Sequence, residues 1–202
     1  MEQLFRLRRF LEAPEPARRK GQACELCGAA IDNVHAHVID LKNRRLLCTC
    51  RPCYLLFKHS GAAGGKFRSV PDRFLELPDL SISLEGLQIP VGIAFFLWNS
   101  ARNRVTAFYP SPAGATESGL PLETWQEMVK ENPALGAMEP DIEALLICRR
   151  RDNFDAWIVP VDACYELAGR IRTHWKGFEG GEAWREIDAF LAGLRERERN
   201  CA

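Results

Sequence analysis

Two cysteine pairs constrain this chain more than any other feature of its sequence. Cys24 and Cys27 form one pair, Cys50 and Cys53 form the other, and about twenty residues separate the pairs. Two intervening residues let each pair wrap a tight turn with both thiolates directed at one ion. Four thiolates make the tetrahedral cage that zinc, or iron in a rubredoxin-like site, prefers. The sequence therefore predicts that these four cysteines bind a single metal ion.

A fifth cysteine, Cys48, leaves the ligand set open. The chain has 8 cysteines, and five of them fall between positions 24 and 53. In a reducing compartment this crowding favours metal ligation over disulfide formation. In a strand, Cys48 and Cys50 point to the same face, so Cys48 could replace Cys50 as a ligand. Alternatively, it could lie beside the cage as a core residue or a redox-reactive neighbour.

The segment around the cysteine pairs has the pattern of a turn, a strand hairpin, a second turn and a short helix. Gly28 permits the backbone angles of a turn, and alternating residues predict strands at His35 to Leu41 and at Arg45 to Thr49. Tyr54 to His59 is expected to form a helical turn. This order is that of a zinc ribbon or a treble clef, so we expect a small metal module of one of these two kinds.

The glycine-rich segment 61–65 divides the chain into two expected domains. It holds three glycines in five residues and is predicted to be a flexible linker. Residues 1–65 would then contain the metal module, preceded by a short amphipathic helix at Leu4 to Leu11. Residues 66–202 would form a second domain. The overall fold class predicted is α+β.

The pattern beyond residue 66 predicts an antiparallel sheet covered by helices. Strand-like runs occur in two hairpins, and Pro110 to Gly119 is expected to be a loop. A helix is predicted from Pro121 to Lys130, and two more close the chain with apolar residues at three- and four-residue spacing. We therefore expect a four-stranded antiparallel sheet, with strands at Val91 to Trp98, Arg104 to Tyr109, Ile142 to Cys148 and Phe154 to Val159.

Charge and hydropathy narrow the functional classes. The chain has 27 basic and 27 acidic residues, and residues 1–73 hold 14 Lys or Arg against 7 Asp or Glu. A basic metal module could face an acidic partner, nucleic acid or the acidic second domain, although a solvated mixture of charges is an equally simple interpretation. Nucleic acid is not the expected partner.

The longest apolar run, Ile89 to Trp98, is far below the roughly 20 residues that span a bilayer. With no leader pattern at Met1 to Leu11, we expect a cytoplasmic protein.

Two histidines near the cysteines raise the question of catalysis. His35 and His37 face one side of the expected strand and, with Asp40, partly resemble HNH endonucleases, in which a histidine on a hairpin between cysteine pairs activates water. Those enzymes usually place a histidine or asparagine after the last pair, whereas Tyr54 to Phe57 form an apolar run here. The simpler interpretation is that the histidines pack or hydrogen-bond beside the metal cage. No catalytic residues are predicted.

Several runs of the chain resemble a bacterial family of unknown function that is often encoded among the genes of actinobacterial-type nickel–iron hydrogenases. The resemblance covers nearly the whole chain and is carried by Cys24 to Gly28, His37 to Leu41, Arg45 to Cys48, Cys50 to Phe57, Phe108 to Ser118 and Val159 to Leu167. It implies a non-catalytic accessory role in hydrogenase assembly or function, with a hydrogenase subunit or maturation factor as the partner.

The same context leaves a second role open, in which four thiolates hold iron and pass one electron as rubredoxin-like proteins do. Rubredoxins place a glycine after the second cysteine pair, which frees backbone N–H groups to bond the sulfurs. Tyr54 stands at that position here. The sequence therefore favours zinc over iron, and it does not fix the oligomeric state.

Overall fold

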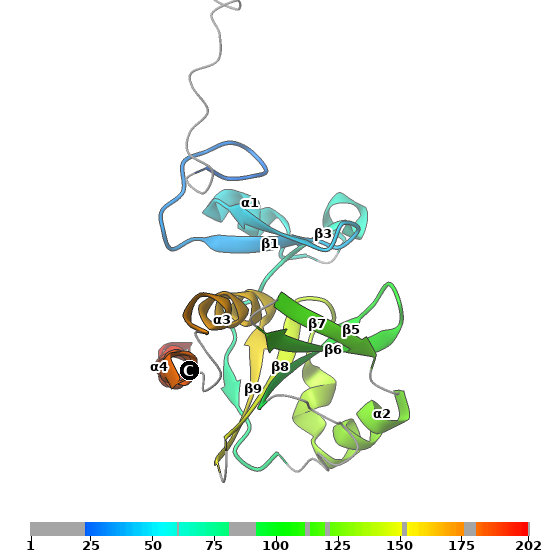
Figure 1. The fold of residues 1–202 in the computed structure, drawn as a ribbon. Helices are drawn as coiled ribbons and strands as arrows, with labels where there is room; N and C mark the ends of the chain where they lie inside the picture. The colour runs from blue at the N-terminus through cyan, green and yellow to red at the C-terminus, as the bar shows by residue number, and fades with distance from the viewer. Residues whose placement is uncertain are drawn as a thin grey trace, which may run out of the picture. The chain divides into compact units, whose positions relative to one another are not determined.

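The computed structural model describes residues 23–59, 61–80, 92–111, 114–119, 122–150, 153–175 and 181–201. The chain divides into two compact units, Met1–Ser69 and Val70–Ala202. Figure 1 shows the elements of each. The helix expected at Leu4 to Leu11 lies outside the described residues.

The first unit is built on a three-stranded antiparallel sheet in the order β2-β1-β3. Its elements are β1 (Ala36–Asp40), β2 (Arg45–Thr49), α1 (Arg51–Leu56), the 3-10 helix η2 (Ala62–Gly65) and β3 (Phe67–Ser69). The β1–β2 hairpin agrees with the strands predicted from alternation, and α1 begins three residues before the predicted helical turn.

One face of this sheet packs against α1. Val38 and Leu47 are opposite each other on β1 and β2, and both are buried. Tyr54 of α1 is buried as well, and its carbonyl accepts a hydrogen bond from the Ser69 hydroxyl on β3. The backbone N–H of Ser69 donates to the Phe57 carbonyl at 3.1 Å. These contacts tie the helix to the strand that follows it.

The predicted flexible linker proves to be part of the first unit. Ala62–Gly65 forms η2, in which Gly64 and Gly65 have φ angles of 65° and 74° that glycine tolerates without strain. The next residues, Phe67–Ser69, pair with β1. Local glycine content indicated flexibility, but a sheet partner that is 27 to 31 residues away cannot be recognised from local sequence. The division between the units falls after Ser69.

The second unit is a six-stranded antiparallel sheet with helices, which confirms the predicted mixed α and β class. The strand order is β4-β9-β8-β5-β6-β7. Its strands are β4 (Leu75–Glu76), β5 (Ile93–Asn99), β6 (Arg104–Ser111), β7 (Gly114–Gly119), β8 (Glu143–Arg150) and β9 (Asn153–Pro160). Its helices are α2 (Leu122–Glu131), the 3-10 helix η4 (Pro133–Ala137), α3 (Val161–His174) and α4 (Gly181–Cys201).

The sheet is wider than predicted because two short edge strands join the four expected ones. The predicted loop from Pro110 to Gly119 was wrong: β6 runs to Ser111, and β7 pairs with it along its whole length. β4 pairs with β9 through two residues only. Edge strands need not bury both faces, so neither carries the apolar pattern by which strands are recognised.

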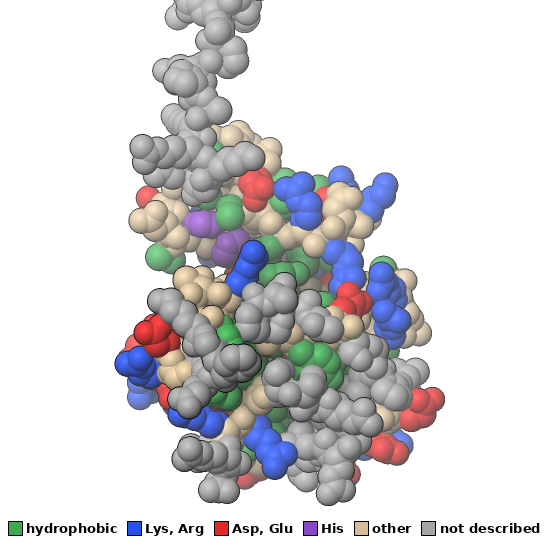
Figure 2. Space-filling view, in the orientation of Figure 1, with side chains coloured by type: hydrophobic (Ala, Val, Ile, Leu, Met, Phe, Trp, Pro, Cys, Tyr) green, Lys and Arg blue, Asp and Glu red, His purple; other side chains and the backbone are tan. Residues whose placement is uncertain are grey.

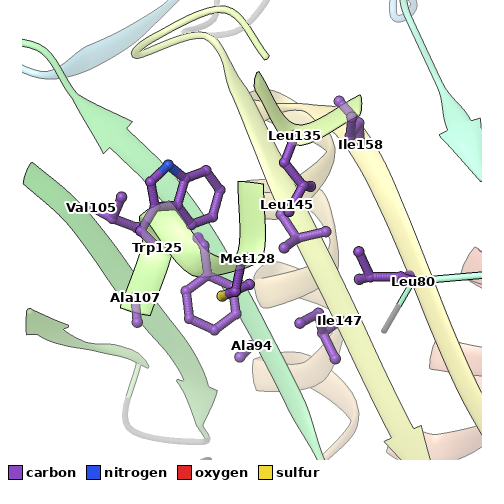
Figure 3. Close-up of a cluster of buried hydrophobic side chains, with 12 residues drawn as sticks. Leu80, Ala94, Val105, Ala107, Trp125, Met128, Leu135, Leu145, Ile147 and Ile158 are labelled. Atoms are coloured by element: carbon purple, nitrogen blue, oxygen red, sulfur yellow. The ribbon is translucent and has the colours of Figure 1, made fainter. Parts of the chain in front are cut away.

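The core of the second unit lies on both faces of this sheet. One cluster joins Phe96 and Leu145 of the sheet to Trp125 and Met128 of α2 (Figure 3). Side chains one position along the strands, such as Leu146, Trp157 and Val159, point to the opposite face and are also buried. Helix α3, with Cys164, Leu167 and Ile171 buried, contacts β6 to β9. The second unit therefore has an extensive apolar core of its own.

No helix among the described residues is long and apolar enough to cross a membrane.

Candidate metal centre

The first cysteine pair lies in a tight turn before the hairpin. The Cys24 N–H donates to the Ala29 carbonyl at 2.7 Å, and the Gly28 N–H donates to the Cys24 carbonyl at 2.8 Å. Gly28 has a φ of 76°, which a residue with a side chain rarely adopts. Ala23 and Ala30 close the turn as an isolated antiparallel bridge. The turn thus fixes the backbone on both sides of Cys24 and Cys27.

The second cysteine pair lies at the start of α1. Cys50 is the residue that precedes the helix, and its carbonyl accepts the Tyr54 N–H at 3.0 Å. Pro52 is in the first helical turn, where its missing N–H costs no hydrogen bond and its fixed φ suits a helix. Cys53 follows within the same turn. The helix start therefore brings two thiols two residues apart to one end of α1.

The four predicted cysteines converge in the folded chain. Their sulfur atoms, those of Cys24, Cys27, Cys50 and Cys53, all lie within 4.8 Å of one another. The Cys27 and Cys50 sulfurs are 3.6 Å apart. A tetrahedron of sulfurs about 2.3 Å from zinc has edges of about 3.8 Å. None of the cysteines whose side chains the structure describes forms a disulfide. The four cysteines therefore lie close enough to hold a metal ion.

The acidity of these thiols follows from their surroundings. Burial raises the pKa of Cys24, but hydrogen bonds from the backbone N–H groups of Cys50, Cys27 and Leu26 outweigh it and lower the pKa to about 6. Burial and the neighbouring thiols raise the pKa of Cys53 well above its usual range. Four thiolates in so small a volume repel one another, so all four ionise at neutral pH only with a cation between them.

A glutamate that the sequence analysis did not single out joins the first turn to the hairpin. The Cys48 N–H donates to Glu25 Oε2 at 2.7 Å, and the Arg45 guanidinium is 3.3 Å from Glu25 Oε1. The Glu25 N–H donates in turn to the Cys48 carbonyl at 2.9 Å. This exchange fixes the first cysteine pair beside β2, and no local pattern could have revealed it because the partners are 23 residues apart.

Cys48 belongs to a different group from the four. It lies opposite His37 in the β1–β2 ladder, and ligand atoms of His35, His37 and Cys48 all lie within 4.8 Å of one another. Burial and the charges of Glu25 and Cys24 raise the pKa of Cys48.

Asp40, the third member of the nuclease-like set, is directed elsewhere. Its carboxylate accepts the N–H groups of Lys42 and Asn43, each at 3.1 Å, and the Asn43 side-chain amide at 2.7 Å. Burial raises the pKa of Asp40, but the hydrogen bonds from Asn43 and Lys42, together with the charge of Lys66, outweigh it and lower the pKa below its usual value. Asp40 is three residues from His37, on the opposite face of β1. It therefore stabilises the hairpin turn and does not join the histidines.

The second unit has a cavity of about 410 Å³ between α2, η4 and β5. Trp98, Trp125, Val129 and Met138 make most of its wall apolar, and Lys130 is the one charged residue among the described residues that line it. These described residues bring together no pair of groups suited to acid–base or nucleophilic chemistry.

Comparison with known proteins places the chain in a family. Neither the curated proteins nor the solved structures gave a match to it. A family model does match, and it covers residues 23–198, which include the cysteine turns and nearly the whole second unit. The chain belongs to the family of unknown function DUF5947.

Proposed function

We propose that the first unit is a zinc-dependent binding module in a non-catalytic accessory protein. The observation that carries this proposal is the convergence of four sulfurs from the first turn and the start of α1. The order of turn, hairpin and helix, with the second pair at the helix start, is that of a treble clef. Four protein thiolates leave zinc no open position, so this ion would contribute folding energy instead of reacting with a substrate.

The exposed apolar residues of the first unit support a docking role. Val34 is 93 % exposed, and Leu55 and Leu56 of α1 are 46 % and 65 % exposed. The two leucines follow Cys53 and Tyr54 in the same helix, so the metal would hold their backbone in place. Large apolar side chains held on a rigid element are typical of protein-binding surfaces. We propose that the exposed face of α1 with Leu55 and Leu56 binds a protein partner. We also propose a cytoplasmic location for the complex.

The resemblance described above suggests which partner this is. We propose a hydrogenase subunit or a hydrogenase maturation factor, a proposal that rests on the family's genetic context alone. Affinity purification of the tagged chain from cells expressing the hydrogenase genes should recover such a protein. The Leu56→Asp variant should lose it and keep its metal, whereas Tyr165→Asp, which changes an exposed residue of the second unit, should retain it. Recovery of no hydrogenase-related protein by the unchanged chain would contradict the proposal.

A second role is favoured by the exposure of Cys27. An iron ion with a ligand at the surface can exchange electrons with a partner, and the Cys27 residue is exposed whereas Cys24 is buried. Elemental analysis combined with an absorption spectrum separates the two roles. Zinc protein should be colourless, with no charge-transfer bands in the visible range. Red protein that contains iron in place of zinc would replace the binding-module proposal with a rubredoxin-like electron carrier.

A further inference from the structure

The β1–β2 hairpin carries a second group of metal-ligating side chains beside the four cysteines. His37 and Cys48 are directly opposite each other in the ladder, and His35 lies two residues before His37. Because side chains alternate along a strand, these residues share one face. The His35 and His37 ring centroids are 4.9 Å apart. Figure 2 shows histidine side chains together on the visible face of the first unit.

The hydrogen bonding of His35 prepares its ring for a metal. Its Nδ1 lies 2.9 Å from the Asp32 carbonyl oxygen. A carbonyl only accepts, so the bond requires that Nδ1 carry a proton, and in the neutral imidazole Nε2 is then left with a free lone pair. A histidine that ligates through one nitrogen commonly donates its other N–H to such a carbonyl, which fixes the ring and its tautomer.

The free lone pair of His35 is buried. Its Nε2 is inaccessible to solvent and has no hydrogen-bond partner among the described residues. A buried polar atom without a hydrogen-bond partner is rare in folded proteins, so it calls for an explanation. A ring nitrogen of His35 lies within 4.8 Å of the ligand atoms of both His37 and Cys48. A cation bound by all three side chains would satisfy the buried lone pair.

We propose that His35, His37 and Cys48 bind a second divalent transition-metal ion, of the class that zinc represents. Two imidazoles and one thiolate suit such borderline-soft ions and do not suit magnesium or calcium. Cys48 and Cys50 are two residues apart and belong to different groups, so the two ions would be neighbours. With three protein ligands the second ion keeps a position for water or an external ligand, and it binds more weakly than the four-cysteine ion.

The number of bound ions tests this proposal directly. The full-length chain is loaded with zinc and freed of unbound metal by gel filtration. Its zinc content per chain is then measured by inductively coupled plasma mass spectrometry. We expect about two ions per chain for the unchanged protein, and about one for the His35→Ala/His37→Ala and Cys48→Ser variants. His174→Ala is the matched control, because His174 Nδ1 also bonds a backbone carbonyl, that of Arg170, at 3.0 Å. It should keep both ions.

A spectroscopic titration keeps the proposal testable if the histidine variants fail to fold. Cobalt(II) added to the metal-free unchanged chain should bind in two steps, and the second step should add further d–d bands. In a parallel titration with diamagnetic zinc, the second step should shift the 15N resonance of His35 Nε2. A single step that leaves His35 unchanged would overturn the second site and spare the four-cysteine site. Binding of no ion by the unchanged chain would overturn both proposals.

Discussion

The surroundings of the described cysteines separate them into two chemical classes. Cys148 and Cys164 are only 4 % and 0 % exposed, and they lie among the apolar side chains of the second unit. Burial, with the nearby Asp155 and Asp188, raises the pKa of Cys148 to about 12, and burial also raises the pKa of Cys164. These thiols stay protonated at neutral pH and serve as small apolar groups, whereas the thiols of the first unit face one another.

Thiol reactivity should therefore report which unit is folded. In a Cys201→Ser background, which leaves only cysteines whose side chains the structure describes, a chelator at pH 8 should make all five thiols of residues 24–53 reactive toward a disulfide reagent. Cys148 and Cys164 should react only after denaturant is added, because burial both blocks access and suppresses the thiolate. Peptide mapping of the labelled sites checks this. Early labelling of Cys148 would contradict the assignment.

A buried carboxylate in the second unit depends on a single arginine. The Glu143 side chain is 1 % exposed, and Arg73 donates to it through Nε and a terminal nitrogen, both at 2.6 Å. The Glu139 N–H adds a third bond at 2.8 Å. A buried charge that loses its partner is strongly destabilising, because its desolvation is then uncompensated.

We expect Arg73→Ala to lower the free energy of unfolding of the second unit by about 3 kcal/mol. Arg102→Ala is the control, because its pair with Glu117 is exposed on both sides and should contribute less than about 1 kcal/mol. Urea unfolding followed by tryptophan fluorescence measures this unit alone, since all 5 tryptophans follow residue 70. Equal effects of the two substitutions would contradict the importance of the buried pair.

At the level of elements, the sequence predicts those whose pattern is local. The β1–β2, β5–β6 and β8–β9 hairpins were predicted because apolar residues alternate on both sides of a short turn. Strand β7 could not be predicted in this way, because Gly114–Gly119 has no apolar alternation and is defined by its pairing with β6. The four cysteines could be grouped from the sequence because the two-residue spacing within each pair is a local pattern. The group of His35, His37 and Cys48 could not, because it depends on the register between two strands.

The pairing of β5 with β8 depends on Gly92, the residue directly before β5. The Gly92 carbonyl accepts the Arg149 N–H, and a Cβ at Gly92 would overlap the Arg149 carbonyl oxygen and approach the Trp184 ring to 3.0 Å. A backbone atom cannot move aside as a flexible side chain can.

Gly92→Ala should therefore destabilise the second unit by about 1–3 kcal/mol, the usual cost of overpacking. Gly169→Ala in α3 is the matched control. A Cβ there meets nothing within 4 Å, so alanine should be neutral or stabilise by up to about 1 kcal/mol through its helix propensity. Tryptophan fluorescence in urea compares the two variants. If Gly92→Ala proved as stable as Gly169→Ala, the close β5–β8 contact would be wrong.

On the scale of the whole molecule, the two units differ in what stabilises them. The second unit has apolar layers on both faces of a six-stranded sheet. Among its described residues, the first has a three-stranded sheet, two short helical segments and few buried apolar side chains, which resembles the small domains that need a metal or disulfides. A structural zinc ion contributes on the order of 10 kcal/mol to such a module.

Removal of the metal should consequently unfold one unit and spare the other. After chelation, hydrogen exchange should become fast at the backbone amides of β1 and β2, while those of β8 and β9 remain protected and tryptophan fluorescence is unchanged. Mass spectrometry of peptic peptides resolves the two sets. Simultaneous loss of protection in both sets would show that the units unfold together.

The central claim is that four sulfurs bind one ion, and X-ray absorption at the zinc edge tests it most directly. In protein loaded with one equivalent of zinc, the first coordination shell should consist of four sulfur atoms at about 2.3 Å, and Cys53→Ser should replace one of them by a nitrogen or oxygen. A shell made mainly of nitrogen or oxygen in the unchanged protein would contradict the account.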